Sequence, residues 1–205
     1  MKKTIITFIL IIILSSISVV FADEGRTAID PNDQAIIEWT QVIANNPNDA
    51  IAYFKRGKAY EGKSQYDDAI SDLTKAIEIN PNYAAAYLTR GYIYNNKKNQ
   101  EELAFADYNN AVICDSNYAY AYNNRGWIYL KKGQYDLAIQ DFNKSIELNP
   151  KYIKPYFNKG TAYEKQQQYQ DAIDTYKTLL INISSQDTKS IENAKNRIRA
   201  LGGIV

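Results

Sequence analysis

The sequence predicts an all-α protein built as an array of helical hairpins that follow one pattern. The chain repeats itself with a period close to 34 residues, which is typical of stacked supersecondary units. Within each unit, small residues recur where two helices would cross, and large apolar residues surround them. Breakers such as Pro81 and Pro150 close a unit, because proline cannot continue a helix. We therefore expect two antiparallel helices per unit.

Residues 1–22 are predicted to be a signal peptide. A basic start at Lys2 and Lys3 precedes a long apolar run, and small or apolar residues precede Ala22. We expect cleavage after Ala22, which leaves residues 23–31 as an N-terminal extension. An uncleaved anchor is the alternative, because the apolar run is near the lower limit for crossing a bilayer, and only then is membrane contact expected. In either case the folded part is expected to be exported, to the periplasm or the extracellular space, or to a lumen in a eukaryote.

Composition excludes several classes of function. The chain has no histidine, so it cannot build a histidine-based nucleophile relay or the common histidine zinc sites. Its single cysteine cannot form an internal disulfide, and a formal charge of +1 lacks the basic excess that nucleic-acid binding requires. We expect no enzyme activity, cofactor, bound metal, nucleic acid or small-molecule substrate, and a protein or peptide as the partner.

Four units begin at Ala50, Ala84, Ala119 and Ile153, at spacings of 34, 35 and 34 residues. The extra residue of the second unit falls within residues 96–102, where its inter-helix turn is predicted and where an insertion costs little. The recurring residues are tyrosine at position 4 (Tyr53, Tyr87, Tyr122, Tyr156), glycine at position 8 (Gly57, Gly91, Gly126, Gly160), tyrosine at position 11 (Tyr60, Tyr94, Tyr129, Tyr163) and alanine at position 20 (Ala69, Ala104, Ala138, Ala172).

This pattern resembles the tetratricopeptide repeat family. The resemblance covers residues 32 to about 183, although Ser116 replaces the closing proline of the second unit and the fourth unit lacks one. It implies a right-handed α-solenoid whose concave face commonly holds peptides. The predicted repeat domain spans residues 32–205, divided into a half repeat (32–49), four repeats (50–83, 84–118, 119–152 and 153–184) and a capping helix (187–201).

Each end of the array requires its own explanation, because a stack of units leaves two open faces. Upstream, Ala35, Trp39 and Pro47 match the second helix of a unit whose first helix is missing. Downstream, the capping helix has one apolar face (Ile191, Ala194, Ile198 and Leu201) and one basic face.

A ladder of structural ion pairs is predicted inside the array. Position 7 supplies Arg56, Arg90, Arg125 and Lys159, and position 23 supplies Glu38, Asp72, Asp107 and Asp141. Each acid precedes a base by 18 residues, so we expect it to bond the cation of the next repeat. Pairing within a unit is disfavoured, since it leaves Glu38 without a cation and places Thr175 opposite Lys159. A row of catalytic carboxylates is the less favoured alternative, because each acid already has a cationic partner.

The candidate binding groove lies on the concave side of the first helices. Once the scaffold positions are set aside, the centre of this surface is aromatic and rich in amides. The predicted peptide-binding residues are Tyr92, Tyr120, Asn123, Asn124, Trp127, Lys154, Phe157 and Asn158. Amides can pair with a peptide backbone while rings hold side chains. The alternative is that these rings pack against neighbouring helices.

Two functions remain open. The preferred hypothesis is an exported scaffold or adaptor that binds an extended segment of a partner protein in this groove. The alternative is a structural subunit of an envelope, secretion or assembly complex, which would use its convex face or its edge helices.

Overall fold

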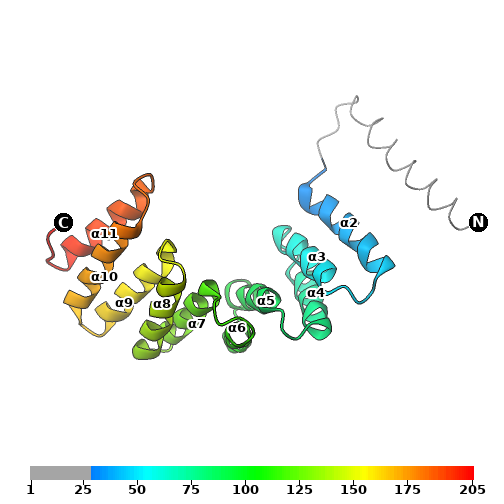
Figure 1. The fold of residues 1–205 in the computed structure, drawn as a ribbon, viewed down its shortest axis with the longest axis horizontal. Helices are drawn as coiled ribbons and strands as arrows, with labels where there is room; N and C mark the ends of the chain where they lie inside the picture. The colour runs from blue at the N-terminus through cyan, green and yellow to red at the C-terminus, as the bar shows by residue number, and fades with distance from the viewer. Residues whose placement is uncertain (1–28) are drawn as a thin grey trace, which may run out of the picture.

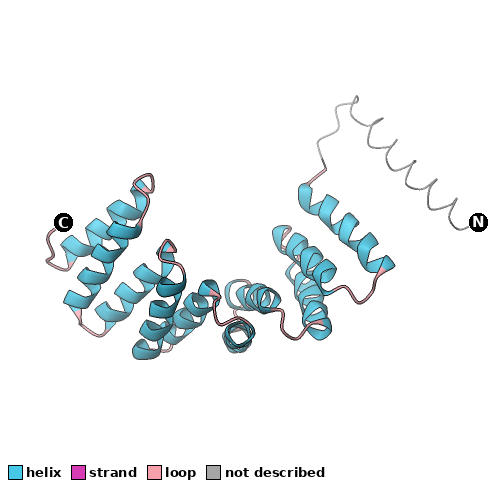
Figure 2. Ribbon diagram, in the orientation of Figure 1, coloured by secondary structure: helices cyan, strands magenta, loops and turns pink. Residues whose placement is uncertain are grey.

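The computed structural model describes residues 29–205, and these form ten α-helices with no strand among them (Figures 1 and 2). The helices are α2 (Pro31–Asn45), α3 (Ala50–Gly62), α4 (Tyr66–Ile79), α5 (Ala84–Asn96), α6 (Glu101–Cys114), α7 (Ala119–Lys131), α8 (Tyr135–Leu148), α9 (Ile153–Lys165), α10 (Tyr169–Asn182) and α11 (Thr188–Ala200). The predicted signal peptide lies outside the described residues. Within them, no helix has the length and apolar character needed to cross a membrane.

The helices follow one another along a curved array, with α2 at one end and α11 at the other (Figure 1). Successive pairs from α3/α4 to α9/α10 form the four hairpins. The all-α solenoid predicted from the repeat is therefore confirmed.

Glycine at position 8 allows the two helices of a hairpin to approach closely. A Cβ atom added at Gly126 would lie 2.8 Å from Cε1 of Phe142, and one at Gly91 would lie 2.9 Å from Cε1 of Tyr108. Phe142 is fully buried and Tyr108 is nearly so. The aromatic ring of the second helix therefore fills the space that a side chain at position 8 would need.

The turn inside each hairpin uses a left-handed residue. Ser64, Asn99, Gly133 and Gln167 have φ values of 61°, 52°, 73° and 61°. Only the third repeat has glycine there, the residue that adopts this conformation most readily. The second repeat accommodates its extra residue between Asn96 and Glu101, so the helices on either side keep their registers.

The two ends of the array differ in packing. No residue of α2 is buried, and among residues 29–205 it packs mainly on α3. In α11, Ala194 and Ile198 are fully buried against the core of the fourth repeat. The capping helix therefore covers the core of the fourth repeat, while α2 contributes no buried side chain at the other end of the described residues.

Buried tyrosines make the stability of the fold depend on pH in the alkaline range. Burial raises the pKa of Tyr152 and of Tyr176 to about 12, and it raises the pKa of Tyr108 as well. Unfolded tyrosines ionise near pH 10, so the unfolded state loses these protons first as the pH rises. The stabilisation is complete below about pH 10 and is lost as the pH approaches about 12.

We predict that the free energy of unfolding falls steeply between these two pH values. Tyrosinate absorbance should show a class of tyrosines that ionises late, and Tyr176→Phe should remove one proton from that class. Ionisation of all tyrosines in one step near pH 10, in the folded protein, would contradict this prediction.

Candidate functional site

The ion-pair ladder forms within each hairpin and not between repeats. Arg56 bonds Asp72 through two hydrogen bonds of 2.7 and 2.8 Å. Arg90 bonds Asp107 at 2.9 and 2.8 Å, and Arg125 bonds Asp141 at 2.8 and 2.7 Å. The predicted pairs Glu38 with Arg56, Asp72 with Arg90, Asp107 with Arg125 and Asp141 with Lys159 are therefore wrong.

The close crossing at glycine explains the pairing. A Cβ atom at Gly91 would lie 3.1 Å from Cβ of Asp107, and one at Gly126 would lie 3.0 Å from Cβ of Asp141. The acid at position 23 thus stands directly opposite position 8 of the same unit. The arginine at position 7, one residue earlier, can reach it with two parallel bonds.

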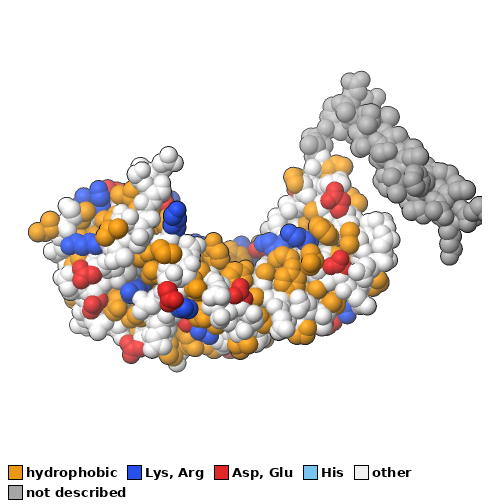
Figure 3. Space-filling model, viewed as in Figure 1, with side chains coloured by type: hydrophobic (Ala, Val, Ile, Leu, Met, Phe, Trp, Pro, Cys, Tyr) orange, Lys and Arg blue, Asp and Glu red, His pale blue; other side chains and the backbone are white. Residues whose placement is uncertain are grey.

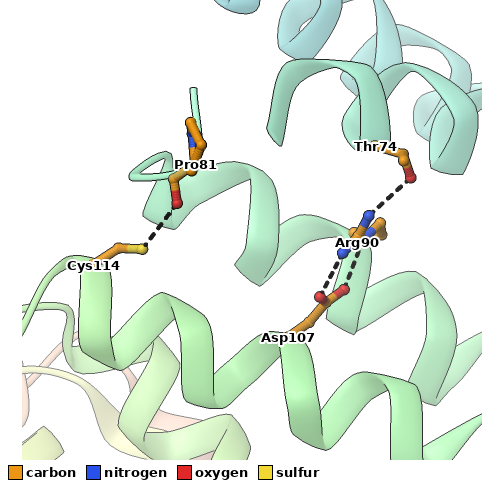
Figure 4. A network of polar contacts seen from close by, with 5 residues as sticks. All are labelled: Thr74, Pro81, Arg90, Asp107 and Cys114. Atoms are coloured by element: carbon orange, nitrogen blue, oxygen red, sulfur yellow. Dashed lines mark hydrogen bonds and ion pairs between the residues drawn. The ribbon is translucent and has the colours of Figure 1, made fainter. Parts of the chain in front are cut away.

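The link to the preceding repeat comes from the same arginine through a neutral side chain. Figure 4 shows Arg90 between Asp107 of its own hairpin and Thr74 of the hairpin before, whose Oγ1 accepts a bond of 2.8 Å. Arg56 donates to Thr40 at 3.1 Å and Arg125 to Asn109 at 3.1 Å. Each arginine therefore fixes both its own hairpin and the register to the previous one.

The two ends of the ladder lack the predicted pairs. Glu38 is exposed and accepts a 2.8 Å bond from Gln34 of its own helix. Lys159 lies near Thr175 and has no hydrogen bond or ion pair among the described residues, although its Nζ is 5.5 Å from the centre of the Tyr163 ring. Burial lowers the pKa of Lys159, and the charge of Asp171 opposes that change.

The predicted groove residues gather around one cavity of about 270 Å³. It opens among the first helices α5, α7 and α9, with one residue from α6. Seven of the eight predicted residues line it, namely Tyr92, Asn123, Asn124, Trp127, Lys154, Phe157 and Asn158. Figure 3 shows the hollow side of the arc, with lysine and arginine side chains on its flanks.

Aromatic side chains are accessible in this cavity. Tyr92 is 40% exposed and Trp127 is 39% exposed, so neither ring is sealed inside the array. Tyr120 is also exposed but lies outside the cavity, where its ring packs 4.7 Å from that of Tyr152. Tyr120 thus contacts the cavity wall only indirectly, because the hydroxyl of Tyr152 accepts a bond from Asn123.

Three asparagines form a connected network on the cavity wall. Asn123 Nδ2 donates to Asn124 Oδ1 at 3.1 Å and to Tyr152 Oη at 3.2 Å, and Asn123 Oδ1 accepts from Asn158 Nδ2 at 3.0 Å. Asn123 is only 3% exposed, and both of its amide hydrogens are used. Its role is to orient its neighbours, and it has no free donor for a ligand.

The network leaves two groups free at the cavity. Asn124 Nδ2 donates to no described residue, and Asn158 Oδ1 accepts from none. A donor and an acceptor are therefore held on neighbouring helices, as an extended backbone requires.

Sequence reasoning missed some residues of this surface. Tyr108, a buried ring of the second helix that lies against Gly91, also lines the cavity and is not among the predicted groove residues. Arg197 of the capping helix pairs at 3.1 Å with Glu164 near the end of the first helix α9. The absence of a side chain at Gly91 was the signal that could have identified Tyr108.

Models of the tetratricopeptide repeat match residues 50–83 and 119–152, and a second model with the same description matches residues 73–104 and 142–174. A search of curated proteins found no match.

Solved structures share the fold. The structure titled "Crystal structure of MamA" is 26% identical with a TM-score of 0.66, and the match covers 76% of this chain and 96% of that one. YrrB, titled a TPR protein with an unusual peptide-binding site, is 21% identical with a TM-score of 0.64, covering 80% and 84%. The first TPR of Spaghetti (RPAP3), bound to an HSP90 peptide, is 23% identical with a TM-score of 0.54, covering 58% and 93%. The chain belongs to the tetratricopeptide repeat family.

Proposed function

We propose that this protein is an exported, non-catalytic scaffold that binds an extended segment of a partner protein in its concave groove. The observation that carries the proposal is the cavity of about 270 Å³, which combines exposed Tyr92 and Trp127 with free polar groups on Asn124 and Asn158. Rings supply buried apolar area on binding, while oriented amides pair with a backbone.

Similar structures support this choice, since the titles of YrrB and of the RPAP3 domain name a peptide-binding site and a bound peptide. Export rests on the pattern of residues 1–22 alone.

The permanent-subunit alternative has less support. Ile113 and Ile181 are 79% and 83% exposed on second helices, but they belong to repeats that are not adjacent. Single exposed apolar residues are normal on a protein surface. The groove offers a cavity, and these residues do not.

The test is a peptide-affinity measurement on variants of the groove. Peptides selected on the purified protein from a displayed library should bind Tyr92→Ala/Trp127→Ala at least about tenfold more weakly, because exposed rings of this kind are typical binding hot spots. Fluorescence anisotropy gives the affinities, and a thermal melt checks the fold.

Tyr169→Ala is the matched control. Tyr169 is 49% exposed at the start of α10 and does not line the groove cavity. Its loss should leave peptide affinity unchanged. Equal affinities in the protein and the double variant would reject the groove as the binding site.

A further inference from the structure

The fourth repeat breaks the ladder and leaves a cation that forms no ion pair with a carboxylate among residues 29–205. Where the first three repeats have arginine and aspartate, this repeat has Lys159 and Thr175. Lys159 is half-buried, and its Nζ makes no hydrogen bond to any residue in 29–205. The repeat therefore buries part of a positive charge without the compensation that its neighbours have.

A second cavity of about 190 Å³ opens at this point. It lies between α8, α9 and α10, and Lys159, Asp171, Asp174 and Thr175 supply its polar lining together with Thr178. It shares no lining residue with the groove cavity. It is thus a separate site, and its existence does not depend on the proposed function.

The charges of the cavity select against a simple anion. Lys159 favours a carboxylate, but the exposed carboxylates of Asp171 and Asp174 would repel a ligand that carried only negative charge. A simple cation would in turn be repelled by Lys159. A ligand with both charges, a short distance apart, satisfies all three residues.

The hydrogen-bonding groups of the cavity also favour a ligand with one negative and one positive group. The hydroxyl of Thr175 donates to the carbonyl of Asp171 at 2.8 Å, and that of Thr178 donates to the carbonyl of Asp174 at 2.8 Å. Both hydroxyls can therefore only accept from a ligand. The cavity offers one strong donor, Lys159, and several acceptors, which complement one carboxylate and one ammonium group.

We propose that this cavity binds an α-amino acid zwitterion, with its carboxylate on Lys159 and its ammonium group toward Asp171 and Asp174. Ile146 and Tyr163 provide apolar walls for a side chain. The volume of about 190 Å³ is below the roughly 300–1,000 Å³ of cavities for drug-sized ligands, which fits a single amino acid. This assignment departs from the sequence-based expectation that no small molecule binds.

The experiment is an NMR titration of the purified protein with L-leucine as the probe. Leucine at millimolar concentration should shift backbone amide signals of α9 and α10 in a saturable way. Acetate and isobutylamine, which each carry one of the two charges, should give no saturable shift at matched ionic strength. An equal response to acetate alone would overturn the proposal, as would no response to leucine.

Two variants test the role of the polar groups. Lys159→Met keeps most of the apolar stem and should weaken leucine binding by about tenfold or more, because a charge-assisted bond is lost. Lys154→Met removes a lysine from the groove instead and should leave leucine binding unchanged. Unaltered leucine binding in Lys159→Met would overturn the proposal.

Thr175→Asp supplies the missing carboxylate beside Lys159. It should raise the thermal midpoint and abolish the leucine response while keeping Lys159 in place. A full leucine response in this variant would contradict the assignment. Trp127→Ala should bind leucine normally whether or not the groove binds peptides, so failure of the two proposals can be distinguished.

Discussion

Asp107→Ala is expected to lower the free energy of unfolding by about 3–5 kcal/mol, because it leaves the buried guanidinium of Arg90 without its charge partner. Asp107 is 3% exposed, and the Arg90 side chain is 16% exposed. Burial raises the pKa of Asp107, while the bond from Arg90 counteracts that change, so Arg90 helps Asp107 to stay charged. Urea unfolding followed by circular dichroism measures the loss.

The partner of Asp107 can be identified by double variants. Arg90→Met in the Asp107→Ala background should recover most of the lost stability, because an apolar side chain removes the uncompensated charge. Arg125→Met should not recover the lost stability, because it also leaves Asp141 without its cationic partner. Recovery with Arg125→Met alone would instead support pairing between repeats.

An exposed pair provides the reference for this effect. Glu78→Ala breaks the surface bridge to Lys75, in which the Glu78 side chain is 59% exposed. Its cost should stay below about 1 kcal/mol, because solvent screens such pairs. A similar cost for Glu78→Ala and Asp107→Ala would mean that burial does not determine the strength of the ladder.

The hairpin array could be predicted because its cause is local and repeated. Glycine at position 8 and alanine at position 20 determine where two helices cross, and four copies of the pattern make chance agreement negligible. The position of the extra residue could be predicted for the same reason, because both helices of the second unit keep the repeated pattern and only the turn between them can differ. A four-residue turn between Asn96 and Glu101 absorbs it without changing either helix.

The partners in the ladder could not be predicted from spacing. The interval from position 23 to position 7 of the next unit is constant simply because the inserted residue lies elsewhere, between the two helices of one unit. A constant interval along the chain therefore does not show that the two residues are in contact. The deciding factor is the approach at Gly57, Gly91 and Gly126, which places the acid beside the arginine of its own hairpin.

Most of the residues predicted for the groove line one cavity, but the hydrogen-bonding role of each amide there could not be predicted. Helical periodicity places Asn123, Asn124 and Asn158 on the concave side, and the structure has all three on the cavity wall. Which amide is consumed internally depends on side-chain torsions and on Tyr152, which the chain brings in from the end of the third repeat. Periodicity contains no information about such torsions. The function of the groove in binding peptides stays a prediction.

The glycines at position 8 are expected to respond unequally to alanine, which tests how tightly each hairpin crosses. A Cβ at Gly57 would lie 3.2 Å from Cγ of Leu73, which a small shift can accommodate. A Cβ at Gly160 would lie 2.5 Å from Oη of Tyr176, whose ring is fully buried. Alanine gains about 1 kcal/mol of helix propensity over glycine at both sites.

Gly57→Ala should therefore be close to neutral, while Gly160→Ala should cost about 1–3 kcal/mol through overpacking. Chemical denaturation of both variants measures the difference. In a double-variant cycle, Tyr176→Leu should abolish the extra cost of Gly160→Ala, because the ring that meets the new methyl group is gone. Ring contact does not limit the crossing distance if the two glycine variants lose the same free energy of unfolding. The same conclusion follows if Gly160→Ala keeps its full loss in the Tyr176→Leu background. The approach of the helices at position 8 would then have to be set elsewhere, and the geometric explanation of the ladder would fail with it.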